Sequence, residues 1–316
     1  MNEQIINEIS KDLNIENKQT IATLEMLEEG NTIPFIARYR KDKTANLTEE
    51  QIKAIADVYE YQVNLLKRKE DVIRLIDEKG LLTEELKKQI FEASKLVEVE
   101  DLYRPYKEKK KTKATEAIKN GLEPLAKMIM SCPLKGNIEE LSNKFINENV
   151  KTIEDAIMGA KYIIAEWISD NASYRKYIRN NMFKFGLLET KKKKNELDET
   201  KVYEMYYEYA EALNKVAGHR VLAINRGEKE KILVVKIEAP VDDIQRYLEK
   251  KVIENDKAET SVVLKEVIVD ADEEELKQFV DIDDVKLGAW KKESEYIKGK
   301  YIRAKSYIEM GYDGKL

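Results

Sequence analysis

Residues that could carry acid–base, nucleophilic or metal chemistry are scarce in this sequence. It contains one histidine, His219, and one cysteine, Cys132. A single cysteine excludes a disulfide framework and a cysteine-based zinc site, and a single histidine excludes a multi-histidine metal site. The sequence has no P-loop, no GxGxxG fingerprint and no HExxH motif. We therefore expect no catalytic residue, no metal and no cofactor, and we interpret His219 as a packed, hydrogen-bonded side chain.

Lysine and arginine are abundant and clustered, which points to phosphate binding instead. Residues 103–113 hold six basic side chains against one acid, and residues 174–194 hold eight against one. A third basic and aromatic string is TIPFIARYRK at 32–41. Basic side chains beside aromatic ones are typical of surfaces that contact nucleic-acid phosphates and bases. The alternative interpretation remains open: apolar residues around Pro34 can simply pack, and lysine-rich runs are commonly solvated loops.

The C-terminal residues form another basic and aromatic stretch. Residues 286–305 carry seven basic side chains against two acids, with tyrosines and Trp290 among them. This pattern also fits a surface helix or hairpin whose lysine stems lie along apolar neighbours. Our full set of candidate nucleic-acid-binding residues is Arg38, Arg40, Lys41, Arg104, Lys107, Lys109, Lys110, Lys111, Lys113, Lys191, Lys192, Lys193, Lys194, Lys305 and Tyr307.

The elements that must position these residues are expected to be mainly helical. Of the 316 residues, 37% are charged and 42% are hydrophobic, with few Gly and Pro. This composition favours a folded chain rich in helices. The overall net charge of −5 does not exclude nucleic-acid binding, because local fields decide it. Apolar stretches are too short to span a membrane and the N-terminus has no apolar signal core, so we expect a soluble, cytoplasmic protein.

Apolar periodicity predicts a multi-helix platform with a long helical arm and one small β-hairpin. The arm begins at a capping box, Thr48 to Gln51, and extends to Gly80. Residues 31–40 are expected to be irregular, 202–217 to be a tyrosine-rich helix, and about 220–238 to be the hairpin. We expect three parts: a helical domain over 1–200, a helical segment with the hairpin over 201–271, and an atypical tail, acidic and then basic, over 272–316.

Four strings together resemble the N-terminal region of the Tex family of bacterial transcription accessory proteins. They are TIPFIARYRK (32–41), EDLYRPYKEKKKTKATEAIKNGLEPLA (100–126), DAIMGAKYIIAEWISDNASYRKYIR (155–179) and GHRVLAINRGEKEKILVVKI (218–237). The resemblance covers residues 1 to about 270. It implies a helical platform with a helix-turn-helix-like part in a cytoplasmic RNA-binding transcription protein. A family member would continue into YqgF, helix-hairpin-helix and S1 domains, so we expect a chain truncated before them.

Residues 280–316 resemble a segment near the C-terminus of protein-primed family B DNA polymerases of phages. Lys305 and Tyr307 match the KxY motif of that family, whose Lys and Tyr approach the primer strand. The polymerase carboxylates and exonuclease motifs are absent, so no polymerase activity is expected. The resemblance implies a hybrid reading frame with a join near Ala271.

Two functional hypotheses follow. The first is a non-enzymatic transcription accessory protein that binds the phosphate backbone of RNA or DNA without sequence specificity. The second is a protein–protein interaction scaffold that docks a transcription partner such as RNA polymerase, with lysines acting only as solubilising groups. A truncated remnant without independent function is the third alternative.

Overall fold

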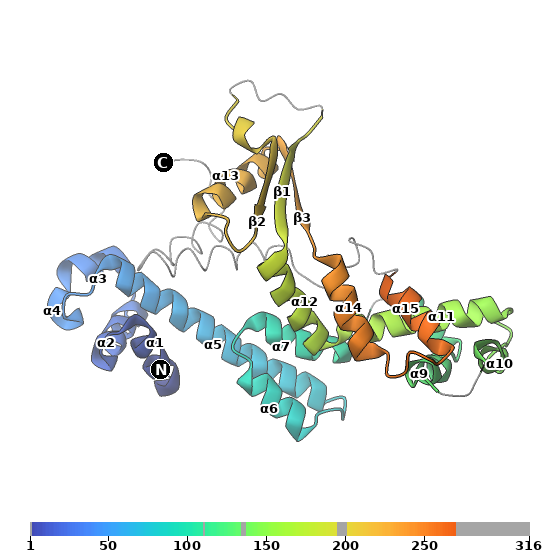
Figure 1. The fold of residues 1–316 in the computed structure, drawn as a ribbon. Helices are drawn as coiled ribbons and strands as arrows, with labels where there is room; N and C mark the ends of the chain where they lie inside the picture. The colour runs from blue at the N-terminus through green and yellow to red at the C-terminus, as the bar shows by residue number, and fades with distance from the viewer. Residues whose placement is uncertain (1, 110, 134–136, 195–200, 270–316) are drawn as a thin grey trace. The chain divides into compact units, whose positions relative to one another are not determined.

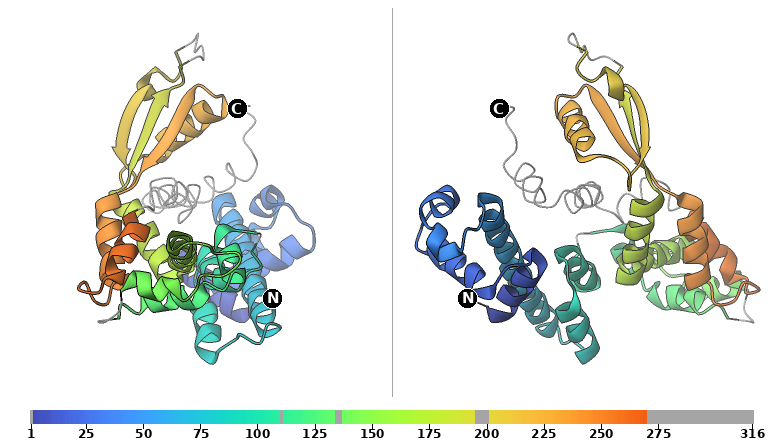
Figure 2. Two further views of the ribbon diagram at one scale, coloured as in Figure 1. Left: turned by 90° about the vertical axis from the view of Figure 1, so that its right-hand side faces the viewer. Right: turned by 60° about the vertical axis from the view of Figure 1, so that its left-hand side comes forward.

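The structure, a computed structural model, describes residues 2–109, 111–133, 137–194 and 201–269. The described residues form two compact units, one ending at Val99 and the other beginning at Glu100. The change of unit lies within helix α7 (Leu96–Tyr103). Each unit is described separately below (Figures 1 and 2).

The first unit is entirely helical over its described residues. Its elements are α1 (Glu3–Leu13), α2 (Asn17–Glu28), α3 (Ile33–Tyr39), α4 (Lys41–Thr44), α5 (Glu49–Asp77) and α6 (Glu84–Glu92). The expected long helix is confirmed as α5, and the hydroxyl of Thr48 accepts a hydrogen bond from the Gln51 amide at 3.2 Å at its start. Ile9, Ile36 and Ile55 are fully buried where α1, α3 and α5 pack together. Their burial provides the apolar surface that holds these helices together.

The prediction that residues 31–40 are irregular is wrong, because most of this stretch forms helix α3. Pro34 lies in the first turn, where its missing amide hydrogen costs nothing and its fixed φ suits a helix. Ile36 and Ala37 are buried, which anchors the short helix in the core. Proline therefore marks where this helix begins.

The second unit combines a helical part with a small sheet. Its helices are η1 (Arg104–Tyr106), α8 (Lys113–Lys119), α9 (Glu123–Met130), α10 (Ile138–Asn143), α11 (Ile153–Asp170), α12 (Ala172–Phe185), α14 (Val241–Val252) and α15 (Thr260–Val269). Helix α11 packs against α8, α9, α10 and α15. Gly159 permits close approach, since a Cβ there would lie 2.3 Å from Cδ1 of Leu122.

The sheet has three antiparallel strands in the order β2-β1-β3. They are β1 (Leu187–Lys192), β2 (Glu208–Ala212) and β3 (Leu233–Glu238), and α13 (Gly218–Lys229) lies against one face (Figure 1). Leu188, Thr190 and Ile237 are buried on the α13 face. We call residues 187–238 the β-module. It also contains η2 (Glu204–Tyr206).

The mainly helical fold with a small β element is confirmed, but the expected two-stranded hairpin at about 220–238 is instead part of a three-stranded sheet. The segment expected as the first hairpin strand is helix α13, whereas the second expected strand is present as β3. A short apolar run does not distinguish a buried helix from a strand, and here Val221, Ile224 and Gly227 are buried at helical spacing. The expected tyrosine-rich helix at 202–217 is instead η2 and β2, in keeping with the strand preference of tyrosine.

The β-module joins the helices at two neighbouring points. Gly186 connects α12 to β1, and Ala239 and Pro240 connect β3 to α14. These points are adjacent because Leu187 pairs with Glu238. Tyr177 of α12 and Tyr247 of α14 stack with nearly parallel rings, which holds the two helices together. The boundary expected near residue 200 falls between β1 and β2, and the tail expected at 272–316 lies outside the described residues.

Candidate nucleic-acid interface

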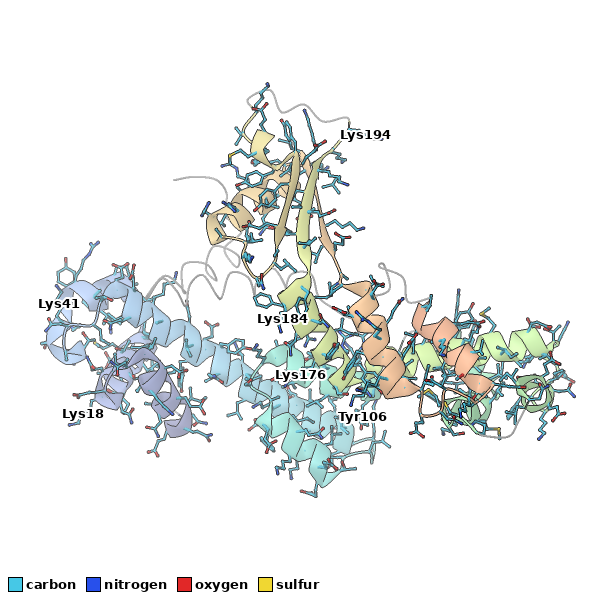
Figure 3. All side chains as sticks on the ribbon, in the orientation of Figure 1. Lys18, Lys41, Tyr106, Lys176, Lys184 and Lys194 are labelled. Carbon is cyan, nitrogen blue, oxygen red and sulfur yellow. The ribbon has the colours of Figure 1, made fainter. Side chains whose placement is uncertain are left out.

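The first candidate surface lies where α3 turns into α4 (Figure 3). We call it the basic corner and define it by Arg38, Tyr39, Arg40, Lys41 and Lys43, all exposed. Packing explains their outward position. The neighbouring Ile36 and Thr44 are buried, and the Thr44 carbonyl accepts a hydrogen bond from Nε2 of Gln19 at 2.9 Å.

Aromatic rings form part of the basic corner. The rings of Phe35 and Tyr39 lie 5.3 Å apart, and the Arg40 guanidinium lies 5.2 Å from the centre of the Phe35 ring. Tyr39 remains 65% exposed. Arg38, Lys41 and Lys43 make no ion pair with any residue that the structure describes. Uncompensated cations beside an exposed ring suit contact with phosphate and base.

The basic cluster at residues 104–113 has a different environment, because acids of the same unit bind several of its members. Arg104 donates to Asp170 at 2.9 Å, and Lys109 pairs with Glu166 at 2.7 Å and also with Asp170. Burial by itself lowers the pKa of Lys109, but hydrogen bonds to the two carboxylates outweigh it, so the pKa is raised. Lys109 thus stays protonated and ties this segment to α11.

The remaining members of that cluster vary in their contacts. Lys111 pairs with Glu116 at 2.7 Å on the surface, and the Lys113 ammonium lies 4.8 Å from the centre of the Tyr162 ring. Lys107 is exposed and makes no ion pair among the described residues. Lys110 lies outside the described residues, as do Lys305 and Tyr307.

Two further arginines of the second sequence cluster are bound internally. Nε of Arg175 and Nη2 of Arg179, both on α12, donate to the buried Asp101 carboxylate at 2.6 and 2.7 Å. Both guanidinium side chains are largely buried. This arrangement connects α7 to α12 and leaves neither arginine exposed for a ligand.

The lysine run 191–194 lies at the end of β1 that is remote from α12 (Figure 3). All four side chains are exposed, and the Lys192 ammonium lies 4.7 Å from the centre of the Tyr207 ring. The Lys193 amide donates to the Ile232 carbonyl at 2.9 Å, which brings the exposed Lys231 alongside. Lys43 and Lys231 are two exposed lysines that sequence clustering missed; both lie next to residues that it did identify.

Other kinds of site have less support within the described ranges. No group of three or more His, Cys, Asp or Glu side chains there could hold a metal ion. His219, expected to be packed, is exposed in the first turn of α13. No described helix is both long enough and apolar enough to cross a bilayer.

Comparison with known protein families shows to which family the chain belongs. Residues 3–77 match the Tex-like protein N-terminal domain, and residues 135–284 match the Tex central region. The chain belongs to the Tex family. The central-region match extends beyond Ala271, so the Tex-like part continues past the expected join.

Three relatives illustrate the similarity. YdcI of Bacillus subtilis (strain 168) is 49% identical over 267 residues, which is 84% of this chain and 37% of YdcI. The transcriptional accessory protein Tex of Neisseria gonorrhoeae is 32% identical over 74% of this chain and 31% of its own length. The human S1 RNA-binding domain-containing protein 1 is 31% identical over 75% of this chain and 24% of its own length. The chain thus spans between 24% and 37% of the length of these relatives.

Proposed function

We propose that this chain is the nucleic-acid-contacting part of a transcription accessory protein and that it acts without catalysis. It binds the phosphate backbone of RNA or DNA through the basic corner. The observation that carries this proposal is the set of exposed cations, Arg38, Lys41 and Lys43, which have no acidic partner among the described residues.

The contrast with residues 104–113 supports the choice of surface. A cation already bound to a buried or half-buried carboxylate must lose that partner before it can neutralise a phosphate. Lys109 is bound in this way by Glu166 and Asp170, whereas Lys41 is not. Binding through free cations releases the counterions of the nucleic acid, which favours association at low salt.

The family supports the class of ligand. Two relatives carry names that state a role in transcription and an RNA-binding domain, respectively. An exposed tyrosine beside lysines and arginines provides a phosphate contact and a stacking face, and neither depends on base sequence. We therefore propose binding without base-specific readout.

A charge-reversal variant with a matched control tests this proposal. We compare Arg38→Glu/Lys41→Glu with Lys67→Glu/Lys95→Glu, which changes the net charge equally at exposed lysines of the same unit that lack ion pairs among the described residues. Fluorescence anisotropy with a labelled RNA strand and a labelled DNA duplex gives the affinity at several salt concentrations. We expect the first variant to bind more weakly at low salt and its salt slope to fall by roughly 1 to 2.

The control variant should retain most of the wild-type affinity. Equal losses in the two variants would show that only net charge matters and would overturn the role of the basic corner. Absence of salt-dependent binding by the wild-type chain would overturn the nucleic-acid proposal itself and favour the scaffold hypothesis. Thermal melts of both variants establish that the fold is retained.

A further inference from the structure

The outer face of α13 presents a line of side chains that the proposed function leaves unassigned. Val221, Ile224 and Gly227 are buried, and a Cβ at Gly227 would lie 2.7 Å from Cδ1 of Leu233 in β3. The opposite face of the helix is exposed at spacings of three and four residues. It consists of His219, Leu222, Arg226 and Lys229.

The C-terminal end of α13 brings this face to the lysine run of β1. The Ile232 amide donates to the Gly227 carbonyl at 2.9 Å, so the chain reverses directly after the helix. The Ile232 carbonyl in turn accepts from the Lys193 amide. These two backbone hydrogen bonds place the segment with Lys229 and Lys231 beside the segment with Lys193 and Lys194. The sequence alone does not indicate that the two segments are neighbours.

Charge compensation on this surface is uneven. Glu230 pairs with Arg226 at 2.9 Å and accepts a hydrogen bond from the Tyr203 hydroxyl at 2.9 Å, so the charge of Arg226 is largely compensated. Lys194, Lys229 and Lys231 are exposed and have no ion-pair partner among the described residues. Three ammonium groups that form no ion pair with a described residue therefore favour a positive local field at one end of the module.

The chemistry of the surface favours a polyanion over an apolar protein partner. Protein interfaces generally have an apolar core and are depleted in lysine. On the outer face of α13 Leu222 is the one apolar side chain with substantial exposure, at 41%. Lysines without acidic partners are instead the groups that neutralise backbone phosphates.

We infer that the outer face of α13, together with Lys194 and Lys231, is a second nucleic-acid contact site. It binds phosphate groups, and we call it the α13 site. A helix of this length extends over about 18 Å, which is enough to follow several successive phosphates. The inference rests on the proposed function for the class of ligand but uses residues of the other unit. The two sites can therefore fail separately.

Neutralising variants of the full chain test the α13 site. The variant is Lys194→Gln/Lys229→Gln/Lys231→Asn, where Asn is chosen because Lys231 has a φ of 63° and Asn tolerates this region. Its control is Lys11→Gln/Lys67→Gln/Lys95→Gln, which removes three exposed lysines of the first unit. With the same RNA and DNA probes, we expect the salt slope of the first variant to fall by about 2 to 3 and that of the control to remain near wild type.

Each outcome has a defined meaning. If the α13-site variant binds with the wild-type slope while Arg38→Glu/Lys41→Glu is impaired, the α13 site is overturned and the basic corner stands. If the reverse holds, the basic corner is overturned and the α13 site stands. Leu222→Ala should leave the affinity unchanged, and a loss equal to that of the lysine variant would mean that the face binds by packing. Thermal midpoints of all variants should agree with wild type, because each altered side chain is exposed.

Discussion

Asp101 is a single carboxylate that accepts hydrogen bonds from two largely buried arginines, Arg175 and Arg179. Removing its charge leaves two guanidinium groups without their counter-ion in a low-dielectric environment. We expect Asp101→Asn to lower the free energy of unfolding by about 3 to 5 kcal/mol. Urea denaturation followed by circular dichroism measures the change.

A control carboxylate shows what burial contributes to that prediction. Asp71 pairs with Arg74 at 3.5 Å on the surface, and both side chains are largely exposed. Asp71→Asn should change the free energy of unfolding by less than about 1 kcal/mol. Similar losses in the two variants would contradict the role assigned to the buried Asp101.

Tyr209 gives a pH dependence that spectroscopy can isolate. Burial and the hydrogen bond that its hydroxyl donates to Glu211 raise its pKa to about 12. Because the folded-state pKa lies above the unfolded value near 10, this stabilisation is complete below about pH 10 and is lost as the pH rises toward 12. Subtracting the titration curve of Tyr209→Phe from that of the wild-type chain gives the phenolate absorbance of Tyr209 alone. We expect this difference to titrate near pH 12. A difference titration centred near pH 10 would contradict the assigned contacts.

At the scale of elements, Gly186 controls how α12 passes into β1. A Cβ there would lie 2.4 Å from the Met182 carbonyl oxygen and 2.9 Å from Cδ1 of Leu213. Backbone atoms cannot move away easily, so we expect Gly186→Ala to destabilise the second unit by about 1 to 3 kcal/mol. Thermal denaturation followed by circular dichroism measures the loss.

Gly159 is the matched comparison, since a Cβ there meets mainly the side chain of Leu122, at 2.3 Å. A side chain can rotate away, and alanine gains about 1 kcal/mol of helix propensity over glycine. Gly159→Ala should therefore cost less than Gly186→Ala. A larger loss of stability in Gly159→Ala than in Gly186→Ala would show that the junction at Gly186 accommodates a methyl group more readily than the core around α11.

Elements with strong local signals could be predicted from the sequence. The long helix α5 follows from the Thr48 capping box and the regular apolar spacing, and both are confirmed. Strand β1 could not be predicted. The lysines in its second half hide the alternation of buried and exposed side chains, and only its pairing with β2 and β3 identifies it as a strand. The sequence of helix α13 predicts a strand for a related reason: its short apolar run does not show that its buried side chains recur at helical spacing against β3.

The candidate site was predictable to the same extent. Clusters of lysine and arginine are visible in the sequence, but the acidic side chains that neutralise their charges are not. The carboxylates that bind Arg104 and Lys109 lie more than fifty residues away in α11. Lys231 joins the lysine run only through the pairing of Lys193 with Ile232. Which cations remain available is a property of the tertiary structure.

At the scale of the whole molecule, the two proposed contact surfaces belong to different units. Effects of substitutions at sites that share no partners generally add to within about 0.5 kcal/mol. We expect the binding free energy lost on combining the basic-corner and α13-site variants to equal the sum of the separate losses. Anisotropy titrations of the two variants and their combination measure this. A combined loss well above that sum would mean that each surface binds nucleic acid by itself when the other is disabled, so that the two do not bind the same strand together.

The paired ends of the β-module have a practical consequence. Leu187 and Glu238 are antiparallel partners, so the chain leaves the helices and returns to them at almost the same point. Such a segment is a cassette in the structural sense, since only a short bridge is needed to replace it. Deleting residues 187–238 and joining the ends by a few glycines should leave α12 and α14 adjacent through Tyr177 and Tyr247. The excised cassette would carry the whole α13 site with it.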